Sequence, residues 1–276
     1  MNLVRSGMGS RELDREAERA LERRSPLVFG FFVRIFRRTF SRDFHALRVS
    51  RRGLPPEAAT PRLVLFSNHP SWWDAVACVL LAQRFFPGRA AFAPIHADML
   101  KRYPFMGRIG AFGIEPEGRA GGAAFLAGAR RILADPEGLL LVTAQGRFAD
   151  ARERPVRLRP GIAHVAALQP DATFVPLALD YVFWDERKPE LLVRFGAPIP
   201  AASLAHRPVA ERTDALARAL EETMNALTLE AMTRDPAAFD ILFAGRVGVG
   251  GVYDAWRRTR AALKGERFSP AHGDER

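Results

Sequence analysis

Residues 63–74 read LVLFSNHPSWWD, and this stretch decides the fold that we predict. Its first four residues form an apolar run that is short enough for a buried strand rather than a helix. Ser71 is a good N-cap residue, and Asp74 stands three positions later, where a capping box places a carboxylate. The stretch therefore predicts a strand, a sharp corner and a helix over residues 71–84.

His69 lies in this corner, at the carboxyl end of the predicted strand, where open α/β sheets bind their ligands. A His and an Asp five positions apart diverge on a continuous helix, because only spacings of three and four share a face. Across a corner they can meet, so that Asp74 accepts a hydrogen bond from one ring nitrogen and the other nitrogen takes a proton from a hydroxyl. The alternative is that Asp74 only caps the helix, Trp72 and Trp73 pack in the core, and His69 is a satisfied corner residue.

The rest of the chain alternates short apolar runs with helical patterns, which predicts an α/β fold. We expect a mixed, mostly parallel sheet flanked by helices, with an N-terminal amphipathic helical segment. The predicted strands are 62–66, 90–95, 111–115, 139–143, 173–179 and 191–195, and residues 46–51 alternate like an edge strand. The predicted helices are 71–84, 119–134, 161–168 and 209–233.

Three parts are predicted along the chain. Residues 1–53 form a basic helical segment at a membrane surface, and residues 54–235 form the α/β domain. Residues 236–276 combine a glycine-rich hinge at 245–251, a basic amphipathic helix and a disordered tail.

The composition is that of a globular protein with a sizeable core, since 48% of the 276 residues are hydrophobic and 26% are charged. The one cysteine, Cys78, excludes an intramolecular disulfide and a zinc site of several thiolates, and its apolar helical surroundings predict a buried thiol. The six histidines show no metal-ligand spacing, so no metal is expected. Because no apolar run of about 18 residues and no signal-peptide pattern occurs, we expect a cytoplasmic protein, peripheral on the inner face of the cell membrane.

The net charge of +10 is concentrated near the N-terminus, where residues 1–62 hold fourteen arginines against seven acidic residues. Such an asymmetry indicates an anionic partner, either nucleic acid or phospholipid headgroups. A GC-rich genome also raises arginine usage without any partner.

Within this region, residues 26–40 have the pattern of a helix with bulky aromatic side chains on one face and arginines on the other. This composition is typical of an interfacial membrane helix, whereas a nucleic-acid helix more often presents polar residues beside its arginines. The alternative is that the aromatic face packs on the domain, and both arrangements can hold on different faces. We expect no nucleic-acid partner and favour membrane contact through Phe29, Phe32, Phe36, Arg34, Arg37 and Arg38.

Four short blocks between residues 60 and 200 resemble those of the glycerolipid and lysophospholipid acyltransferase superfamily. His69 and Asp74, preceded by Asn68, match its His-x4-Asp signature. Residues 110–115 (GAFGIE) stand where its second block lies, residues 143–147 (TAQGR) take the place of its Phe-Pro-Glu-Gly-Thr-Arg block, and residues 175–178 (VPLA) match its proline-bearing strand. Agreement of all four blocks in order and spacing is more specific than any one block.

The resemblance implies transfer of a fatty acyl chain from a thioester donor, acyl-CoA or acyl-carrier protein, to a hydroxyl of a lysophospholipid or related lipid. It implies His69 as general base, Asp74 as the group that orients it, and no cofactor besides the co-substrate. Backbone amides at Ser71 or around Gly146 are candidates to face the oxyanion. The implied partners are the thioester donor, the lipid acceptor and an anionic membrane surface. The implied substrate-binding residues are Asn68, Ser71, Glu115, Arg119, Gln145, Gly146, Arg147 and Pro176.

Two departures from the superfamily pattern concern the acceptor. The arginine of the second block is replaced by Pro116, and the glutamate of the third block by Gln145, with Arg147 one position early. In the superfamily these blocks are thought to hold a phosphate-bearing acceptor, and arginine binds phosphate in a bidentate way that Pro and Gln cannot. A glycolipid, a lipid amine or another hydroxylated lipid is therefore an alternative to lysophosphatidic acid, and a non-catalytic lipid-binding or acyl-carrier-binding protein is a further alternative. The arginines that could still supply an anion site are Arg119, Arg147, Arg152, Arg154, Arg157 and Arg159, and a solvated basic loop explains the last four equally well.

Overall fold

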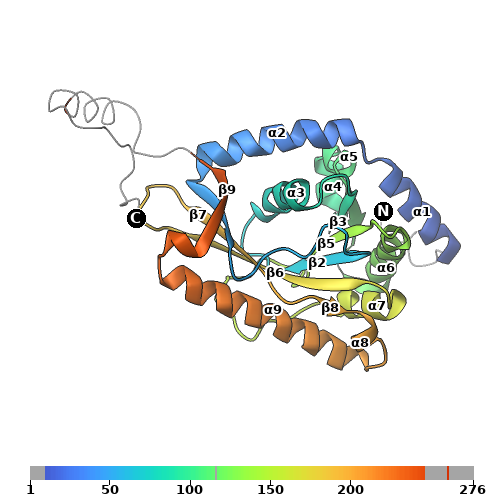
Figure 1. The fold of residues 1–276 in the computed structure, drawn as a ribbon. Helices are drawn as coiled ribbons and strands as arrows, with labels where there is room; N and C mark the ends of the chain where they lie inside the picture. Colours follow the sequence, from blue (N-terminus) through green and yellow to red (C-terminus); the bar gives the residue numbers. More distant parts are fainter. Residues whose placement is uncertain (1–9, 116, 246–259, 261–276) are drawn as a thin grey trace.

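The computed structural model describes residues 10–115, 117–245 and 260 of the chain. These residues form an α/β fold in which helices cover both faces of one mixed, mostly parallel sheet (Figure 1). The predicted fold class is confirmed. The hinge, basic helix and tail predicted after Gly245 lie outside the described residues.

The sheet has nine strands in the order β4-β3-β5-β2-β6-β7-β1-β9, and the short β8 pairs with β6. The pairs β2–β5, β2–β6, β3–β4, β3–β5 and β1–β7 are parallel, whereas β6–β7, β6–β8 and β1–β9 are antiparallel. The strands are β1 (Ala46–Ser50), β2 (Leu63–Ser67), β3 (Ala91–His96), β4 (Ala111–Ile114), β5 (Leu139–Thr143), β6 (Thr173–Val182), β7 (Glu190–Phe195), β8 (Ile199–Pro200) and β9 (Phe239–Ala244).

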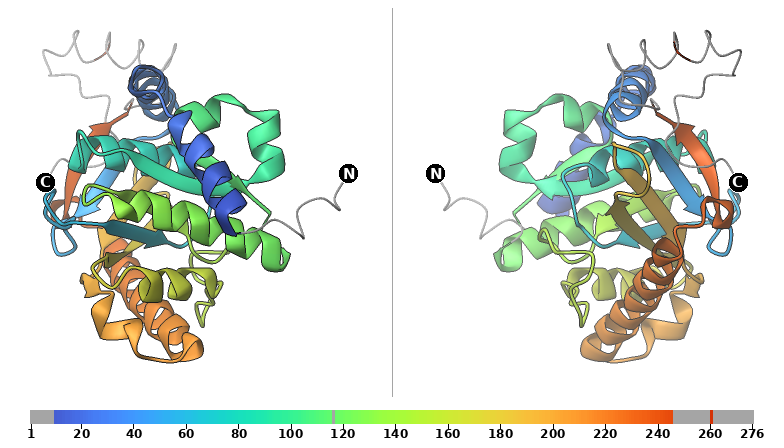
Figure 2. Two further views of the ribbon diagram at one scale, coloured as in Figure 1. Left: turned by 90° about the vertical axis from the view of Figure 1, so that its right-hand side faces the viewer. Right: turned by 90° about the vertical axis from the view of Figure 1, so that its left-hand side faces the viewer.

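The helices are α1 (Ser10–Glu22), α2 (Pro26–Asp43), α3 (Asp74–Phe85), α4 (Ala97–Arg102), α5 (Phe105–Arg108), α6 (Gly118–Ala134), α7 (Gly161–Leu168), α8 (Ala202–Ala205) and α9 (Val209–Met232), with a short 3-10 helix at Pro236–Ala238. α2 and α3 lie on one face of the sheet, and α6, α7 and α9 lie on the other (Figure 1). α1 crosses beside α6 (Figure 2).

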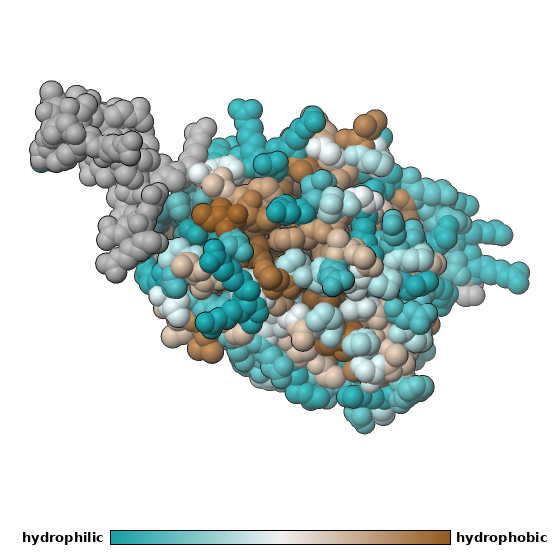
Figure 3. Space-filling model, in the orientation of Figure 1, coloured by the Kyte–Doolittle hydropathy of each residue, from teal (hydrophilic) through white to brown (hydrophobic). Residues whose placement is uncertain are grey.

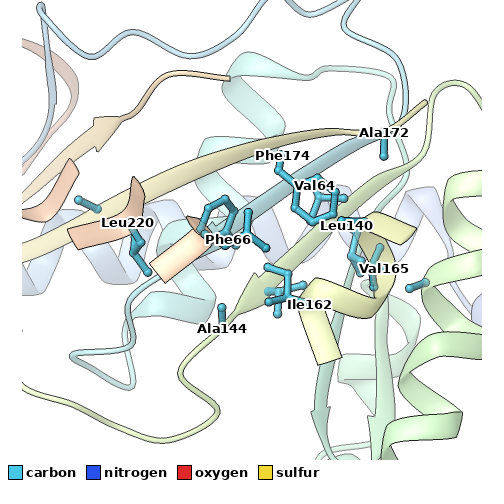
Figure 4. Packing of buried hydrophobic residues seen from close by; sticks show 14 of the residues in the cluster. Val64, Phe66, Leu140, Ala144, Ile162, Val165, Ala172, Phe174 and Leu220 are labelled. Atoms are coloured by element: carbon cyan, nitrogen blue, oxygen red, sulfur yellow. The ribbon is translucent and has the colours of Figure 1, made fainter. Parts of the chain in front are cut away.

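β2 lies at the centre of the sheet and is buried along its whole length. Because successive side chains of a strand point to opposite faces, Leu65 packs with the α2 and α3 cluster, whereas Phe66 packs with the α7 and α9 cluster. Phe66 and Phe174, from neighbouring strands, lie close to Ile162 and Val165 of α7 (Figure 4). Because both faces of β2 are buried, the strand cannot shift in register along its neighbours. The position of its carboxyl end, and of the corner that follows, is therefore fixed.

The prediction that residues 46–51 form an edge strand is wrong. β1 lies between β7 and β9, and all five of its residues are buried. The edge is formed by β9, which the sequence did not reveal because its pairing joins segments nearly two hundred residues apart. The predicted parts 1–53 and 236–276 thus each contribute a strand to the same sheet as the central part.

Candidate functional site

The corner between β2 and α3 is fixed by a buried amide. The Asn68 side chain donates from Nδ2 to the Leu179 carbonyl at 2.9 Å and accepts the Leu179 backbone N–H at Oδ1, also at 2.9 Å. Asn68 is almost fully buried, so its predicted substrate-binding role is replaced by a structural one. It fastens the end of β2 to β6 and so places the next residue, His69.

The segment after β5 holds the backbone of His69 in the same way. The His69 N–H donates to Gln145 Oε1 at 3.1 Å, and its carbonyl accepts the Ala149 N–H at 3.0 Å. Gln145 is buried. Like Asn68, this predicted substrate-binding residue positions the corner, which explains why a neutral amide stands there.

Across this corner the side chains of His69 and Asp74 meet, with His69 Nδ1 2.6 Å from Asp74 Oδ2. The Tyr181 hydroxyl donates to Asp74 Oδ1 at 2.6 Å, and the Ser71 backbone N–H donates to Oδ2 at 3.0 Å. Asp74 is fully buried, and a carboxylate that receives these donors accepts from Nδ1 as well. The proton therefore sits on Nδ1 of His69, and Nε2 is left as an acceptor to which no other described residue hydrogen-bonds.

Asp74 also organises the start of α3. The helix begins at Asp74 rather than at the predicted Ser71, and Trp73 takes the N-cap position without a side-chain capping bond. The Ser71 hydroxyl accepts the Trp73 N–H at 3.2 Å while Asp74 accepts the Ser71 N–H. The carboxylate that orients His69 thus also accepts the Ser71 N–H before the helix, whereas the helix start itself has no side-chain cap.

Two aromatic side chains at the site were missed by the sequence reasoning. The exposed Phe148 ring stacks on the His69 ring, with centroids 4.3 Å apart. Phe148 is the one aromatic residue in a loop rich in charged side chains, residues 146–154, so no periodic signal marked it. Tyr181 was missed because the strand was predicted to end at residue 179, whereas β6 continues to Val182 past the polar Asp180.

Burial of Tyr181, together with the nearby charge of Asp74, raises the pKa of its phenol well above the usual range. The hydroxyl therefore keeps its proton and acts on Asp74 as a permanent donor. Trp73 packs edge-on against Phe44, and the exposed Trp72 packs edge-on against Trp73. The prediction that both tryptophans are core residues holds for neither completely, since Trp73 is only partly buried.

The remaining residues of the third and fourth blocks lie beside the dyad without contacting it. Gly146 has a positive φ of 66°, and a Cβ there would collide with the Arg159 side chain, so the position requires glycine. Arg147 is paired with Glu153 and donates to the Phe148 carbonyl at 3.2 Å. Pro176 is buried within β6 opposite Phe66, so its side chain is part of the interior of the protein in this conformation.

The second block is not brought to the dyad. Glu115 follows β4 and Arg119 lies in the first turn of α6, and β4 is separated from β2 by β3 and β5. Three strand spacings amount to about 14 Å. No hydrogen bond or ion pair within the described part of the chain joins Glu115 or Arg119 to His69 or Asp74.

The amides suggested for an oxyanion are engaged elsewhere. The Ser71 N–H is donated to Asp74, and the Gly146 N–H is donated to the Thr143 carbonyl at 3.0 Å. Neither is therefore available to a reacting carbonyl in this conformation, which corrects their predicted part in substrate binding.

An open groove of about 690 Å³ runs beside the corner that follows His69. Pro70 and Ser71, which directly follow His69, form part of its wall together with Tyr181. The C-terminal ends of α2 and α9 border it from opposite sides, through Phe44 and Met232 respectively. In Figure 3 hydrophobic atoms run across the middle of the face between α2 at the top and α9 at the bottom. The volume lies in the range of small-molecule sites.

The aromatic face predicted to touch a membrane packs inside the protein instead. Phe29 is buried, Phe32 stacks on Phe105 with centroids 4.4 Å apart, and Phe36 packs against the same clusters. The named alternative, packing on the domain, is therefore correct for this face. Arg37 lies over the Phe243 ring of β9 at 5.1 Å from its centroid.

A different stripe of α2 is exposed. Leu27, Phe31 and Ile35 follow one another at four-residue intervals and are 86%, 57% and 38% exposed, with the exposed Arg34 and Arg38 beside them. Four-residue spacing places these three apolar side chains on one side of the helix. The outer side of α2 thus carries both apolar side chains and arginines, whereas the sequence analysis placed the aromatic side chains and the arginines on different faces.

No helix among residues 10–115 and 117–245 is both long and apolar enough to span a bilayer. The described residues also contain no group of three or more His, Cys, Asp or Glu side chains that could bind a metal ion. Comparison with known proteins gives no family model that matches the sequence, and no significant match to a curated protein.

Proposed function

We propose that this protein is an acyltransferase that moves a fatty acyl chain from a thioester, acyl-CoA or acyl-carrier protein, to a lipid hydroxyl. The observation that carries the proposal is the 2.6 Å contact between His69 Nδ1 and the buried Asp74 carboxylate, which leaves Nε2 as the nitrogen that can act as a base. The next two residues, Pro70 and Ser71, line an open groove. The resemblance of the four sequence blocks to the glycerolipid and lysophospholipid acyltransferases supports it. Four residues of these blocks lie together in the structure. They are His69, Asp74, and the two residues that hold the corner, Asn68 and Gln145.

In the proposed reaction, Nε2 of His69 takes the proton of the acceptor hydroxyl while the hydroxyl oxygen attacks the carbonyl carbon of the thioester. A C–O bond forms and the carbonyl π pair moves onto oxygen; when the carbonyl re-forms, the C–S bond breaks. The leaving thiolate receives the proton from the imidazolium, so the products are an ester and a free thiol. Asp74 stabilises the imidazolium, as the carboxylate does in a Ser-His-Asp triad.

The direct test is thiol release with acyl-CoA or acyl-carrier protein as donor and a panel of lyso- and glycolipids as acceptors. His69→Ala and Asp74→Asn should each lower acyl transfer at least about a hundredfold, the scale expected for a general base. His164→Ala is the matched control, because His164 is an exposed histidine on α7. A folded His69→Ala variant with full activity would remove the proposal, as would a wild-type protein that releases no thiol with any acceptor.

We further propose that the outer side of α2 lies on an anionic membrane surface, where the lipid acceptor resides. Leu27, Phe31 and Ile35 would enter the interface, and the arginines beside them would contact lipid phosphates. In this proposal the protein is a peripheral membrane component.

A further inference from the structure

The groove is lined by both aromatic and charged residues. The aromatic residues are Phe44, Trp73, Tyr181, Phe183 and Trp184, and the charged residues are Asp150, Arg152, Asp180 and Arg234. An alkyl chain would remove water from the charged residues without replacing its hydrogen bonds, which is unfavourable. The groove therefore suits a ligand that has both apolar faces and hydroxyl groups.

Each arginine in the groove wall is already paired with a carboxylate. Arg152 forms two hydrogen bonds of 2.9 Å to the two oxygens of Asp150, and its backbone N–H donates to the same carboxylate at 2.8 Å. Arg152 holds the pKa of Asp150 down at about 2. Arg234 donates to Asp185 at 3.0 Å. A phosphate in the groove would have to displace these carboxylates to gain an arginine.

Asp180 adds a negative charge to the groove that a phosphate would meet. It lies on β6 next to Tyr181, and both residues line the groove. Burial raises its pKa, which shows that its charge is poorly solvated. A second anion nearby would deepen this penalty, whereas hydroxyl donors would relieve it, since an ionised carboxylate has about four acceptor positions.

We propose that the groove binds the headgroup of the acyl acceptor and that this headgroup is a sugar, so that the acceptor is a glycolipid. The inference rests on the proposed acyl transfer. The apolar C–H faces of a sugar ring pack on aromatic rings, and Asp150 and Asp180 accept hydrogen bonds from its hydroxyls. A sugar hydroxyl directed towards Pro70 and Ser71 is then the nucleophile from which His69 takes the proton.

The first test compares two acceptors with the unmodified protein. Monoglucosyl diacylglycerol, in which only sugar hydroxyls are free, and lysophosphatidic acid are each supplied with the same acyl thioester, and the products are identified by mass spectrometry. We expect kcat/KM to be at least about tenfold higher for the glycolipid, since a site built for hydroxyls rejects a poorly matched headgroup strongly. Equal or better use of lysophosphatidic acid overturns the inference and leaves the acyltransferase proposal standing. No transfer to either acceptor overturns the inference, and no thiol release with any acceptor overturns both.

The second test removes one charge from the groove. Asp180→Asn keeps the size of the side chain and should lower the ratio of kcat/KM for glycolipid over lysophosphatidic acid about tenfold, because hydrogen bonds to an ionised acceptor are about twice as strong as neutral ones. Asp171→Asn, in the exposed turn before the opposite end of β6, is the matched control and should leave the ratio unchanged. An unchanged ratio in Asp180→Asn contradicts the placement of the headgroup in this groove.

Discussion

The Tyr181 hydroxyl donates to Asp74 Oδ1 at 2.6 Å, on the oxygen opposite the one that holds His69. Asp74 is thereby held by donors on both oxygens, and neither it nor the imidazole can rotate without losing a hydrogen bond. Tyr181 reaches Asp74 from β6, 107 residues later in the chain, so the sheet itself sets the orientation of His69.

Replacement of Tyr181 by Phe should test this positioning role. The aromatic packing is kept, and a hydrogen bond to a charged, buried group is lost, which typically costs about 1.5–3 kcal/mol of stability. We expect kcat to fall about tenfold with little change in KM, because the lost hydroxyl is bound to Asp74 and the aromatic ring that lines the groove is kept. Tyr103→Phe, at a partly exposed tyrosine between α4 and α5, is the control. A full kcat in Tyr181→Phe would mean that Asp74 orients His69 without help.

Gln145 should be needed for the corner rather than for substrate. In Gln145→Met the His69 N–H loses its acceptor in a buried position, at a cost of about 1–3 kcal/mol in the free energy of unfolding. Urea denaturation measures this cost, with Gln83→Met on the exposed side of α3 as the control. If the free energy of unfolding is unchanged and the KM for the acceptor rises, Gln145 binds substrate, as the sequence analysis predicted.

The membrane surface on α2 can be tested by substitution of exposed residues, because the inner side of this helix is part of the core. Leu27→Ser with Phe31→Ser should lower the partition onto vesicles of phosphatidylglycerol and phosphatidylcholine by at least about tenfold, since burial of each such side chain contributes roughly 1.5–3 kcal/mol. Leu168→Ser, at an exposed leucine on α7, is the control for lost surface hydrophobicity.

A charge variant of the same helix separates headgroup attraction from apolar insertion. Arg34→Glu with Arg38→Glu should weaken binding to anionic vesicles more than binding to purely zwitterionic vesicles, and most strongly at low salt. Sedimentation measures both series. Equal loss on both kinds of vesicle would show that the arginines do not read lipid charge.

The Cys78 thiol should be inert in the folded protein. Burial and the nearby charge of Asp74 raise its pKa from 9.0 to about 12, so its thiolate fraction at pH 8 falls by about a thousandfold. Alkylation by iodoacetamide, followed by mass spectrometry, should therefore be far slower in the native protein than in urea. The pKa of Cys78 is higher in the folded protein than in the unfolded chain. The contribution of this group to the free energy of unfolding is therefore complete below pH 9 and is lost as the pH rises from 9 towards about 12. Rapid native labelling would show that the α3 surface around Cys78 is open.

The sequence was most informative where structure is local. A five-residue strand, a corner and a capping pattern lie within residues 63–74, and their geometry follows from short-range rules. The two residues that reach the dyad from distant segments, Tyr181 at Asp74 and Phe148 at His69, had no such signal. For α2, periodicity predicted the aromatic stripe correctly, but an apolar stripe suits a core and a membrane equally, so its direction required the tertiary structure.

The order of the strands in the sheet could not be predicted from the sequence either. The blocks at 110–115 and 143–147 follow each other in sequence, yet β4 and β5 are separated by β3 in the sheet. Resemblance therefore grouped Glu115 and Arg119 with residues that the fold keeps apart. Pairing of β1 with β9 escaped prediction for the same reason, because it depends on contacts between distant segments.

One oxygen of Asp74 serves both the imidazole of His69 and the amide of Ser71 at the entry to α3. Fraying of the first helical turn and release of the imidazole are consequently a single event. On heating, activity should therefore be lost when this turn unfolds locally, at a lower temperature than the unfolding of the sheet.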